Sequence, residues 1–122
     1  MILLGDFFDI ISLETEQGSI NALVEINAGH RIFEGHFPNQ PVVPGVCMMQ
    51  MVKEITEQVL ETETNLSSAA EMKFLAVIDP TQNNIISATI NYTVDGEQVK
   101  TNASLFKDEL VHFKFKGVLI LQ

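Results

Sequence analysis

Residues 35–45 read Gly-His-Phe-Pro-Asn-Gln-Pro-Val-Val-Pro-Gly, and residues 46–61 read Val-Cys-Met-Met-Gln-Met-Val-Lys-Glu-Ile-Thr-Glu-Gln-Val-Leu-Glu. Each of the three prolines in the first part fixes φ and removes a backbone donor, so that part is neither helix nor central strand. The second part contains no proline or glycine and is rich in good helix formers. The sequence therefore predicts a stiff loop that leads into a helix over residues 46–61.

The first half of this helix is almost entirely apolar. Within residues 46–52 the only polar side chain is that of Gln50, a composition typical of a helix enclosed on nearly all sides. Because its neighbours are apolar, we expect Gln50 to lie in a site rather than on the surface. Gln50 also begins a polar helical stripe, and we expect the remainder of that stripe to face solvent: Glu54, Glu57 and Glu61.

The junction of the predicted loop and helix combines hydrogen-bond donors with a candidate base. The first N–H groups of a helix have no internal partners and carry a partial positive charge, so they can stabilise a carbonyl oxygen that gains negative charge. Gly45 and Val46 are the expected donors. His36 is the residue type best suited to accept a proton near neutral pH. Taken alone, a histidine in such a loop is more often a packed structural residue.

The motifs Gly35-His36-Phe37-Pro38, Pro41 and Pro44-Gly45-Val46 resemble the signature of the 3-hydroxyacyl-acyl-carrier-protein dehydratases of fatty acid biosynthesis, which have the hot-dog fold. Residues 72–80, Met-Lys-Phe-Leu-Ala-Val-Ile-Asp-Pro, resemble the strand that follows the central helix in these enzymes. The resemblance implies an α+β fold in which an antiparallel sheet of about six strands wraps around one long central helix. The length of the chain separately predicts that residues 1–122 form a single domain.

In that family the histidine acts as a base, and a carboxylate on the helix of the other subunit handles the departing hydroxyl group. The histidine corresponds to His36, but the carboxylate position, fourteen residues further on, is occupied by Gln50. An amide cannot release a proton near neutral pH and so cannot be a general acid. The loss of such an acid typically costs about 10²- to 10⁴-fold in rate.

Three explanations remain open for the presence of Gln50 at the position of the family's carboxylate. In the first, Gln50 orients the substrate or a water molecule while His36 moves the proton from C2 to the hydroxyl group. In the second, Glu54, one helical turn further on, reaches in as the acid. In the third, the chain is a weakly active or inactive partner that retains acyl binding without the full reaction.

The function implied by the resemblance is a lyase reaction in which a 3-hydroxyacyl thioester loses water to give an enoyl thioester. The substrate would be carried on phosphopantetheine, as an acyl carrier protein or acyl-CoA thioester, and no other cofactor is expected. Phe37 and Met49 are expected to join Gly45 and Val46 in binding the substrate. The alternatives are a non-catalytic acyl-binding or assembly partner of an active dehydratase and an acyl thioesterase of the same fold.

The predicted helix is too apolar for one small sheet to cover, which favours a dimer with a continuous sheet. We expect a homodimer, a higher oligomer or a heterodimer with a related chain. The net charge of −9 argues against nucleic-acid and anionic-membrane partners, since both require a dense basic surface. Arg31 and Lys73 are candidate docking residues for an acidic carrier protein.

The single cysteine of this 122-residue chain permits no internal disulfide, which suits a reducing cytoplasm. We expect Cys47 to be a small buried hydrophobic residue rather than a nucleophile. His30 is expected on the surface, and no third ligand accompanies the two loop histidines, so a zinc site is not expected. No run approaches 18 apolar residues, so no membrane span is expected.

The remainder of the chain has the composition of strands and turns. Gly18 and Asp95-Gly96 mark two predicted hairpin turns, and residues 107–109 a third. Residues 62–68 are polar and are expected to form a turn. In residues 111–116 apolar and polar side chains alternate, which predicts an outward position for His112. Strands are expected near residues 7–14, 19–26, 69–77, 85–94, 98–106 and 111–121.

Overall fold

The computed structural model describes residues 2–35 and 40–122. Six strands form one antiparallel sheet in the order β1-β2-β4-β5-β6-β3. Two helices, α1 and α2, lie between β2 and β3 in the chain, so the predicted α+β class and the six antiparallel strands are confirmed. The elements are β1 (Phe8–Glu16), β2 (Ser19–Ile26), α1 (Ile32–Gly35), α2 (Gly45–Leu60), β3 (Thr64–Phe74), β4 (Ile85–Asp95), β5 (Gln98–Lys107) and β6 (Leu110–Leu121).

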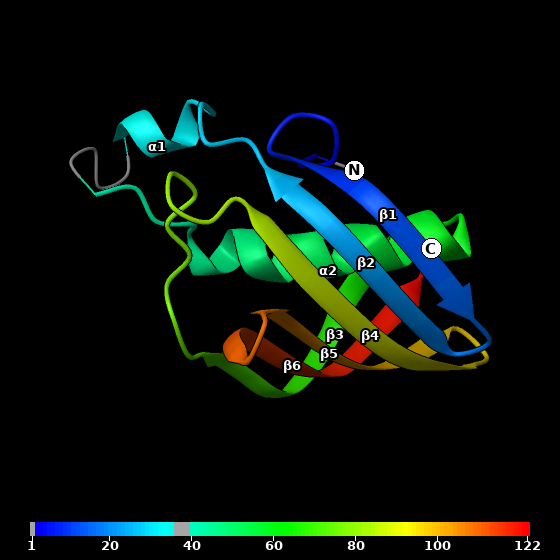
Figure 1. Cartoon of the computed structure of the whole chain (residues 1–122). Coiled ribbons are helices and arrows are strands. Elements are labelled where there is room, and N and C mark those ends of the chain that lie inside the picture. The colour runs from blue at the N-terminus through cyan, green and yellow to red at the C-terminus, as the bar shows by residue number, and fades with distance from the viewer. Residues whose placement is uncertain (1, 36–39) are drawn as a thin grey trace.

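Helix α2 lies against one face of the curved sheet, with β1, β2 and β4 on one side of it and β5, β6 and β3 beneath it (Figure 1). The helix has 16 residues and begins directly after Pro44, an extended N-cap residue with φ −60° and ψ 143°. It ends at Leu60, and the left-handed φ of 57° at the C-cap residue Glu61 turns the chain away from the helix axis. In the part of the chain that the structure describes, no helix combines the length and the apolar content needed to cross a membrane.

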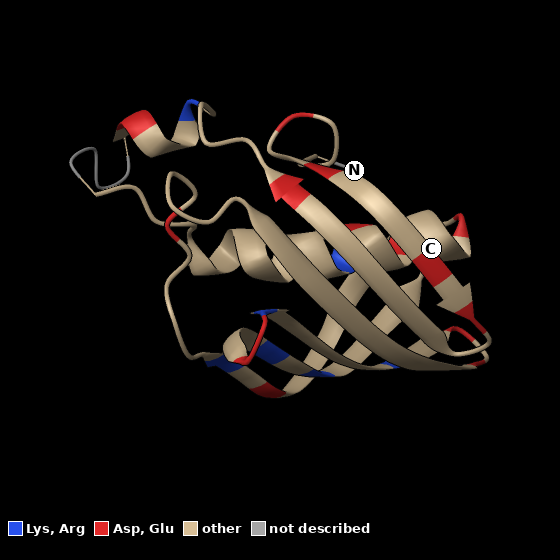
Figure 2. Ribbon diagram, in the orientation of Figure 1, with Lys and Arg blue, Asp and Glu red and all other residues tan. Residues whose placement is uncertain are grey.

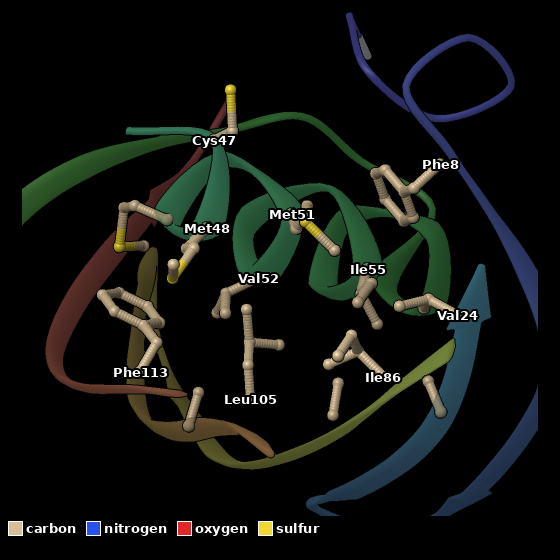
Figure 3. Close-up of a cluster of buried hydrophobic side chains, with 14 of the residues drawn as sticks. Phe8, Val24, Cys47, Met48, Met51, Val52, Ile55, Ile86, Leu105 and Phe113 are labelled. Carbon is tan, nitrogen blue, oxygen red and sulfur yellow. The ribbon is translucent and has the colours of Figure 1, made fainter. Parts of the chain in front are cut away.

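The core lies between α2 and the sheet. Met51, Val52 and Ile55 of the helix are completely buried and point toward side chains of the surrounding strands (Figure 3). Met48 and Met49 belong to the same cluster, so the methionines of the helix serve core packing. The strand residues of the cluster that Figure 3 labels are Phe8, Val24, Ile86, Leu105 and Phe113.

The predicted hairpin turns are confirmed by their backbone angles. Gly18 has φ +79° and Gly96 has φ +63°, values that glycine adopts without a steric penalty. A Cβ atom at Gly18 would also lie 3.0 Å from the carbonyl oxygen of Tyr92. Asp108, between β5 and β6, has φ +52°, which is tolerated better by Asp than by most residues.

The prediction of a turn over residues 62–68 is wrong, because β3 already begins at Thr64. This polar segment pairs with the end of β6, with Thr64 opposite Leu121. Since β3 is the last strand of the sheet, most of its polar side chains are exposed, as is common for edge strands. Pairing with β6 therefore outweighs a local composition that favours a turn.

The outward position predicted for His112 is also wrong. In the pairing of β5 with β6, Leu105 lies opposite Phe113 and Phe106 lies opposite Val111. His112 is thus the extra residue of a β-bulge, and a bulge interrupts the alternation of side chains. The imidazole is buried, with Nδ1 3.1 Å from the carbonyl oxygen of Ala76.

The prediction that the polar stripe of α2 faces solvent is wrong for Glu54 and Glu57, which are buried, and is confirmed for Glu61, which is exposed. The carboxylate of Glu57 accepts hydrogen bonds from the Thr64 backbone N–H at 2.6 Å and from the Thr64 hydroxyl at 3.1 Å. Lys53 donates a further hydrogen bond at 2.9 Å. The polar face of the helix is therefore covered by chain segments whose donors match its carboxylates.

We expect the substitution Glu57→Ala to lower the free energy of unfolding by about 1–3 kcal/mol, because it leaves the buried Thr64 N–H without an acceptor. Urea unfolding would measure the effect. Glu63→Ala removes an exposed carboxylate nearby and serves as the control, with an expected change within about 0.5 kcal/mol. Equal effects of the two substitutions would contradict the structural role of Glu57.

Candidate functional site

The N-terminus of α2 is held in place by the segment before it. The Val43 N–H donates to the carbonyl oxygen of Ile78 at 2.9 Å, which ties the loop to the segment after β3. Cys47 and Met48 both donate their N–H groups to the carbonyl oxygen of Pro44. Within residues 2–35 and 40–122, no acceptor takes the N–H of Gly45 or Val46. The role of these two N–H groups as donors to a ligand carbonyl oxygen stays a prediction.

Position 45 favours glycine because an aromatic ring lies too close to leave room for a side chain. A Cβ atom at this position would lie 2.8 Å from Cε1 of Phe74, whose ring stacks on Phe113 with a centroid distance of 5.1 Å. The side chain of Phe74 is nevertheless 53% exposed and that of Val46 is 75% exposed. The start of the helix and the segment at the end of β3 both carry exposed apolar side chains: Val46, Phe74, Leu75 and Val77.

Gln50 is partly buried one turn further along α2, and its orientation is fixed by Glu54. The Nε2 of Gln50 donates to Oε2 of Glu54 at 2.8 Å. The Glu54 carboxylate, which is completely buried, also accepts hydrogen bonds from the backbone N–H groups of Leu3 at 3.0 Å and Leu4 at 2.7 Å. Since backbone N–H groups only donate, the carboxylate is the acceptor for all three partners. No other described residue binds the Gln50 amide, whose carbonyl oxygen and second N–H have no partner within residues 2–35 and 40–122.

The structure brings five of the seven predicted site residues together on α2: Gly45, Val46, Met49, Gln50 and Glu54. His36 and Phe37 lie outside the described residues, so the pairing of His36 with Gln50 stays a prediction. Met49 is buried within the core cluster. Cys47 is buried too, and the loss of solvent raises the pKa of its thiol, which agrees with the expected structural role.

His30 was predicted to be a surface residue, and the structure shows it buried. Its Nε2 lies 3.0 Å from a carboxylate oxygen of Asp6, and its Nδ1 accepts a hydrogen bond from the Ile32 N–H at 3.1 Å. The ring also meets Phe7 edge-on, at a centroid distance of 5.4 Å. Asp6 is 24 residues away along the chain, so no local pattern indicates this contact.

Basic side chains gather on three strands. Most of the lysines lie on β3, β5 and β6, whereas acidic residues are spread over the rest of the chain (Figure 2). Of the two candidate docking residues, Lys73 lies in this group and is 3.7 Å from Glu71. Arg31 lies elsewhere and is 3.9 Å from Asp6. The lysines of the three strands are Lys73, Lys100, Lys107, Lys114 and Lys116.

Among the described residues, no group of three or more histidine, cysteine, aspartate or glutamate side chains is arranged to hold a metal ion. The donors nearest the helix N-terminus are backbone N–H groups and the Gln50 amide. This set suits a neutral or anionic organic ligand that carries a carbonyl oxygen.

The hydrogen bond from His30 holds the pKa of Asp6 below its usual range, and the positive charges of His30 and Arg31 add to this effect. A carboxyl group with a lowered pKa stabilises the fold fully above its unfolded-state pKa of about 3.9 and loses that contribution as the pH falls through the lowered value. We therefore expect Asp6→Asn to reduce the melting temperature at neutral pH, with the difference from wild type disappearing in acid. Thermal unfolding between about pH 2 and pH 7 would test this. Asp9→Asn, an exposed acid on the same segment, is the control.

Comparisons with known proteins agree with this arrangement. A family model described as "ApeI-like: ApeI dehydratase" matches residues 12–116. The 3-hydroxyacyl-[acyl-carrier-protein] dehydratase FabZ of Aeromonas salmonicida is 27% identical over 117 residues, which cover 95% of this chain and 72% of that protein. The FabZ of Polaromonas sp. is 32% identical over 109 residues, which cover 87% of this chain and 70% of that protein.

Among solved structures, the dehydratase heterocomplex ApeI:P from Xenorhabdus doucetiae matches with a TM-score of 0.73 and 24% identity. The match covers 91% of this chain and 96% of that chain, which shows that the two share a fold. The resemblance to 3-hydroxyacyl dehydratases that the loop motif indicated is thereby confirmed. The chain belongs to the ApeI-like dehydratase family.

Proposed function

We propose that this protein removes water from a 3-hydroxyacyl thioester to give an enoyl thioester. The observation that carries the proposal is the start of α2, where the N–H groups of Gly45 and Val46 are not used by any described residue. Because the chain belongs to a dehydratase family, these two N–H groups are suited to donate hydrogen bonds to the carbonyl oxygen of a thioester substrate. The substrate class is a proposal based on the FabZ relatives, which are named for acyl-carrier-protein substrates.

The proposed reaction begins when the thioester carbonyl oxygen accepts hydrogen bonds from the N–H groups of Gly45 and Val46. These bonds strengthen as the oxygen gains negative charge, so they stabilise the transition state more than the ground state. His36, assigned by the resemblance, accepts the proton from C2. The C3–O bond then breaks, a double bond forms between C2 and C3, and the hydroxyl group leaves as water after taking up a proton.

The geometry of Gln50 and Glu54 favours one of the three accounts of the missing acid. Glu54 is completely buried and its carboxylate accepts hydrogen bonds from three donors, an arrangement that suits a structural role. Gln50 can direct its free carbonyl oxygen and N–H toward the substrate hydroxyl group or a water molecule. We therefore assign the return of the proton to His36 and the orientation of the hydroxyl group to Gln50.

A second chain would complete this site. The exposed apolar side chains near the N-terminus of α2 and the free edge of β3 support pairing with another copy or with a related chain. The relative of known structure is described as a dehydratase heterocomplex, which supports the second option. The lysines of β3, β5 and β6 would favour an acidic carrier protein by charge complementarity.

One observation supports a second candidate function. Because Gln50 cannot supply a proton, the chain would also suit a non-catalytic role in which it binds acyl groups beside an active dehydratase subunit. The two functions differ in whether the purified protein turns over substrate by itself.

The test is to incubate the purified protein with a 3-hydroxyacyl thioester and to follow the absorbance of the conjugated enoyl product. We expect turnover in the wild-type protein and a decrease of about 10²- to 10⁴-fold in kcat for His36→Ala, because the base is lost. Circular dichroism would verify that the variant folds. Acyl binding without turnover would favour the non-catalytic role, and release of a free thiol would indicate a thioesterase.

The substitution Gln50→Glu tests the assignment of the missing acid. A carboxyl group at position 50 would lie beside the Glu54 carboxylate, and two such groups in contact cannot both be ionised. The pair would retain a proton at neutral pH, so we expect kcat to rise by about 10²-fold or more. Gln58→Glu, which adds the same charge to an exposed position of α2, should leave kcat unchanged. An unchanged rate in Gln50→Glu would show that this position does not handle the hydroxyl group.

A further inference from the structure

Residues 3–7 form a compact turn before β1, which we call the N-terminal loop. The N–H groups of Asp6 and Phe7 donate to the carbonyl oxygen of Leu3 at 3.0 and 2.7 Å, and the Gly5 N–H donates to the carbonyl oxygen of Phe8 at 2.8 Å. Asn27, after β2, binds the carbonyl oxygens of both Asp6 and Phe7. The loop is thus closed by its own hydrogen bonds and fastened to the sheet.

The first residues of the N-terminal loop contact the middle of α2. The N–H groups of Leu3 and Leu4 supply two of the three donors to the buried Glu54 carboxylate, and the third is the Gln50 amide. A carboxylate that is 0% exposed is stable only when its oxygens are hydrogen-bonded. The position of Glu54, and through it the orientation of Gln50, therefore depends on where the loop places these two N–H groups.

The last residues of the N-terminal loop contact the start of α1. The carboxylate of Asp6 binds the imidazole of His30, which in turn accepts the hydrogen bond from the first N–H of α1, that of Ile32. The ring of Phe7 packs against the rings of both His30 and Phe33. Helix α1 ends at Gly35, the residue that precedes His36 in the sequence.

We propose that the N-terminal loop is a positioning element that couples the orientation of Gln50 on α2 to the placement of α1. The inference deepens the proposed function and rests on it, because it concerns the two chain segments that contribute the amide and, by the resemblance, the histidine. The loop holds both segments through buried polar groups, Glu54 and His30, whose partners it provides. Only four residues, Leu3 to Asp6, span the contact with Glu54 and the contact with His30. The hydrogen bond from the Asp6 N–H to the Leu3 carbonyl oxygen links the two ends directly.

If two chains share each site, as the resemblance implies, the Gln50 and the α1 of one chain would serve different sites. The N-terminal loop would then connect the amide part of one site with the histidine part of the other. The coupling itself lies within a single chain in either case.

The direct test is a nuclear magnetic resonance measurement on ¹⁵N-labelled protein. The side-chain amide signals of Gln50 are identified by their absence in Gln50→Ala. Asp6→Asn changes the loop at the contact with His30, and Asp6 is half-exposed, so the variant should fold. We expect this change to shift the Gln50 side-chain signals, whereas Asp9→Asn leaves them in place. Identical Gln50 signals in wild type and Asp6→Asn would overturn the inference, whether or not the protein turns over substrate.

Turnover provides a second readout that separates positioning from stability. We expect Asp6→Asn and Glu54→Gln each to lower kcat by roughly tenfold to a hundredfold at temperatures where both variants are fully folded, with little change in KM. Because the two residues act through one loop, the double variant should lose less than the product of the two single effects. Effects that multiply would overturn the inference. A wild-type protein without turnover would contradict the proposed function alone, since the Gln50 signals still test the coupling.

Discussion

A helix that is enclosed by a sheet must find partners for all its polar side chains within the protein. Helix α2 carries the buried groups Glu54, Thr56 and Glu57, and each of them has a specific donor or acceptor. Thr56 donates to the carbonyl oxygen of Val52, one turn back. The two carboxylates instead need donors from other segments, since removing an ionised group from water without compensation is costly. The placement of the N-terminal loop and the start of β3 follows from that requirement.

At the start of the same helix, the first two N–H groups have no acceptor among the described residues. Its first turn contains no acidic residue, and Pro44 provides no side-chain cap for the N–H groups of Gly45 and Val46. A capping side chain would satisfy these donors and remove them from use. The ring of Phe74 lies close to Gly45, so these donors lie beside an apolar side chain, an arrangement suited to a ligand with both a carbonyl oxygen and an apolar part.

Local patterns in the sequence predicted much of the fold, because the responsible interactions are local. Prolines before Gly45, helix formers after it and glycines at positions 18 and 96 act within a few residues. The failures have a common cause in contacts between distant segments. His30 is held by Asp6, and Glu54 by Leu3 and Leu4, partners that no helical or strand period reveals.

His112 shows a different limit of the sequence. Its alternating neighbours are typical of a regular strand, yet a bulge against β5 moves it into the interior. For the candidate site, the sequence identified the helix N-terminus and the unusual Gln50. It did not identify the carboxylate that orients Gln50, because a glutamate on a polar helical stripe has the same pattern whether solvent or a loop covers it.

The amide at position 50 can be understood from its neighbour. Two unit charges 4 Å apart repel each other by about 4 kcal/mol at an effective dielectric constant of 20. An ionised carboxylate at position 50 would meet that repulsion from Glu54, which is already committed to the Leu3 and Leu4 N–H groups. Gln50 avoids the repulsion and adds a donor to Glu54. A chain that holds its N-terminal loop in place with Glu54 therefore favours an amide at position 50, where the resemblance implies an acid.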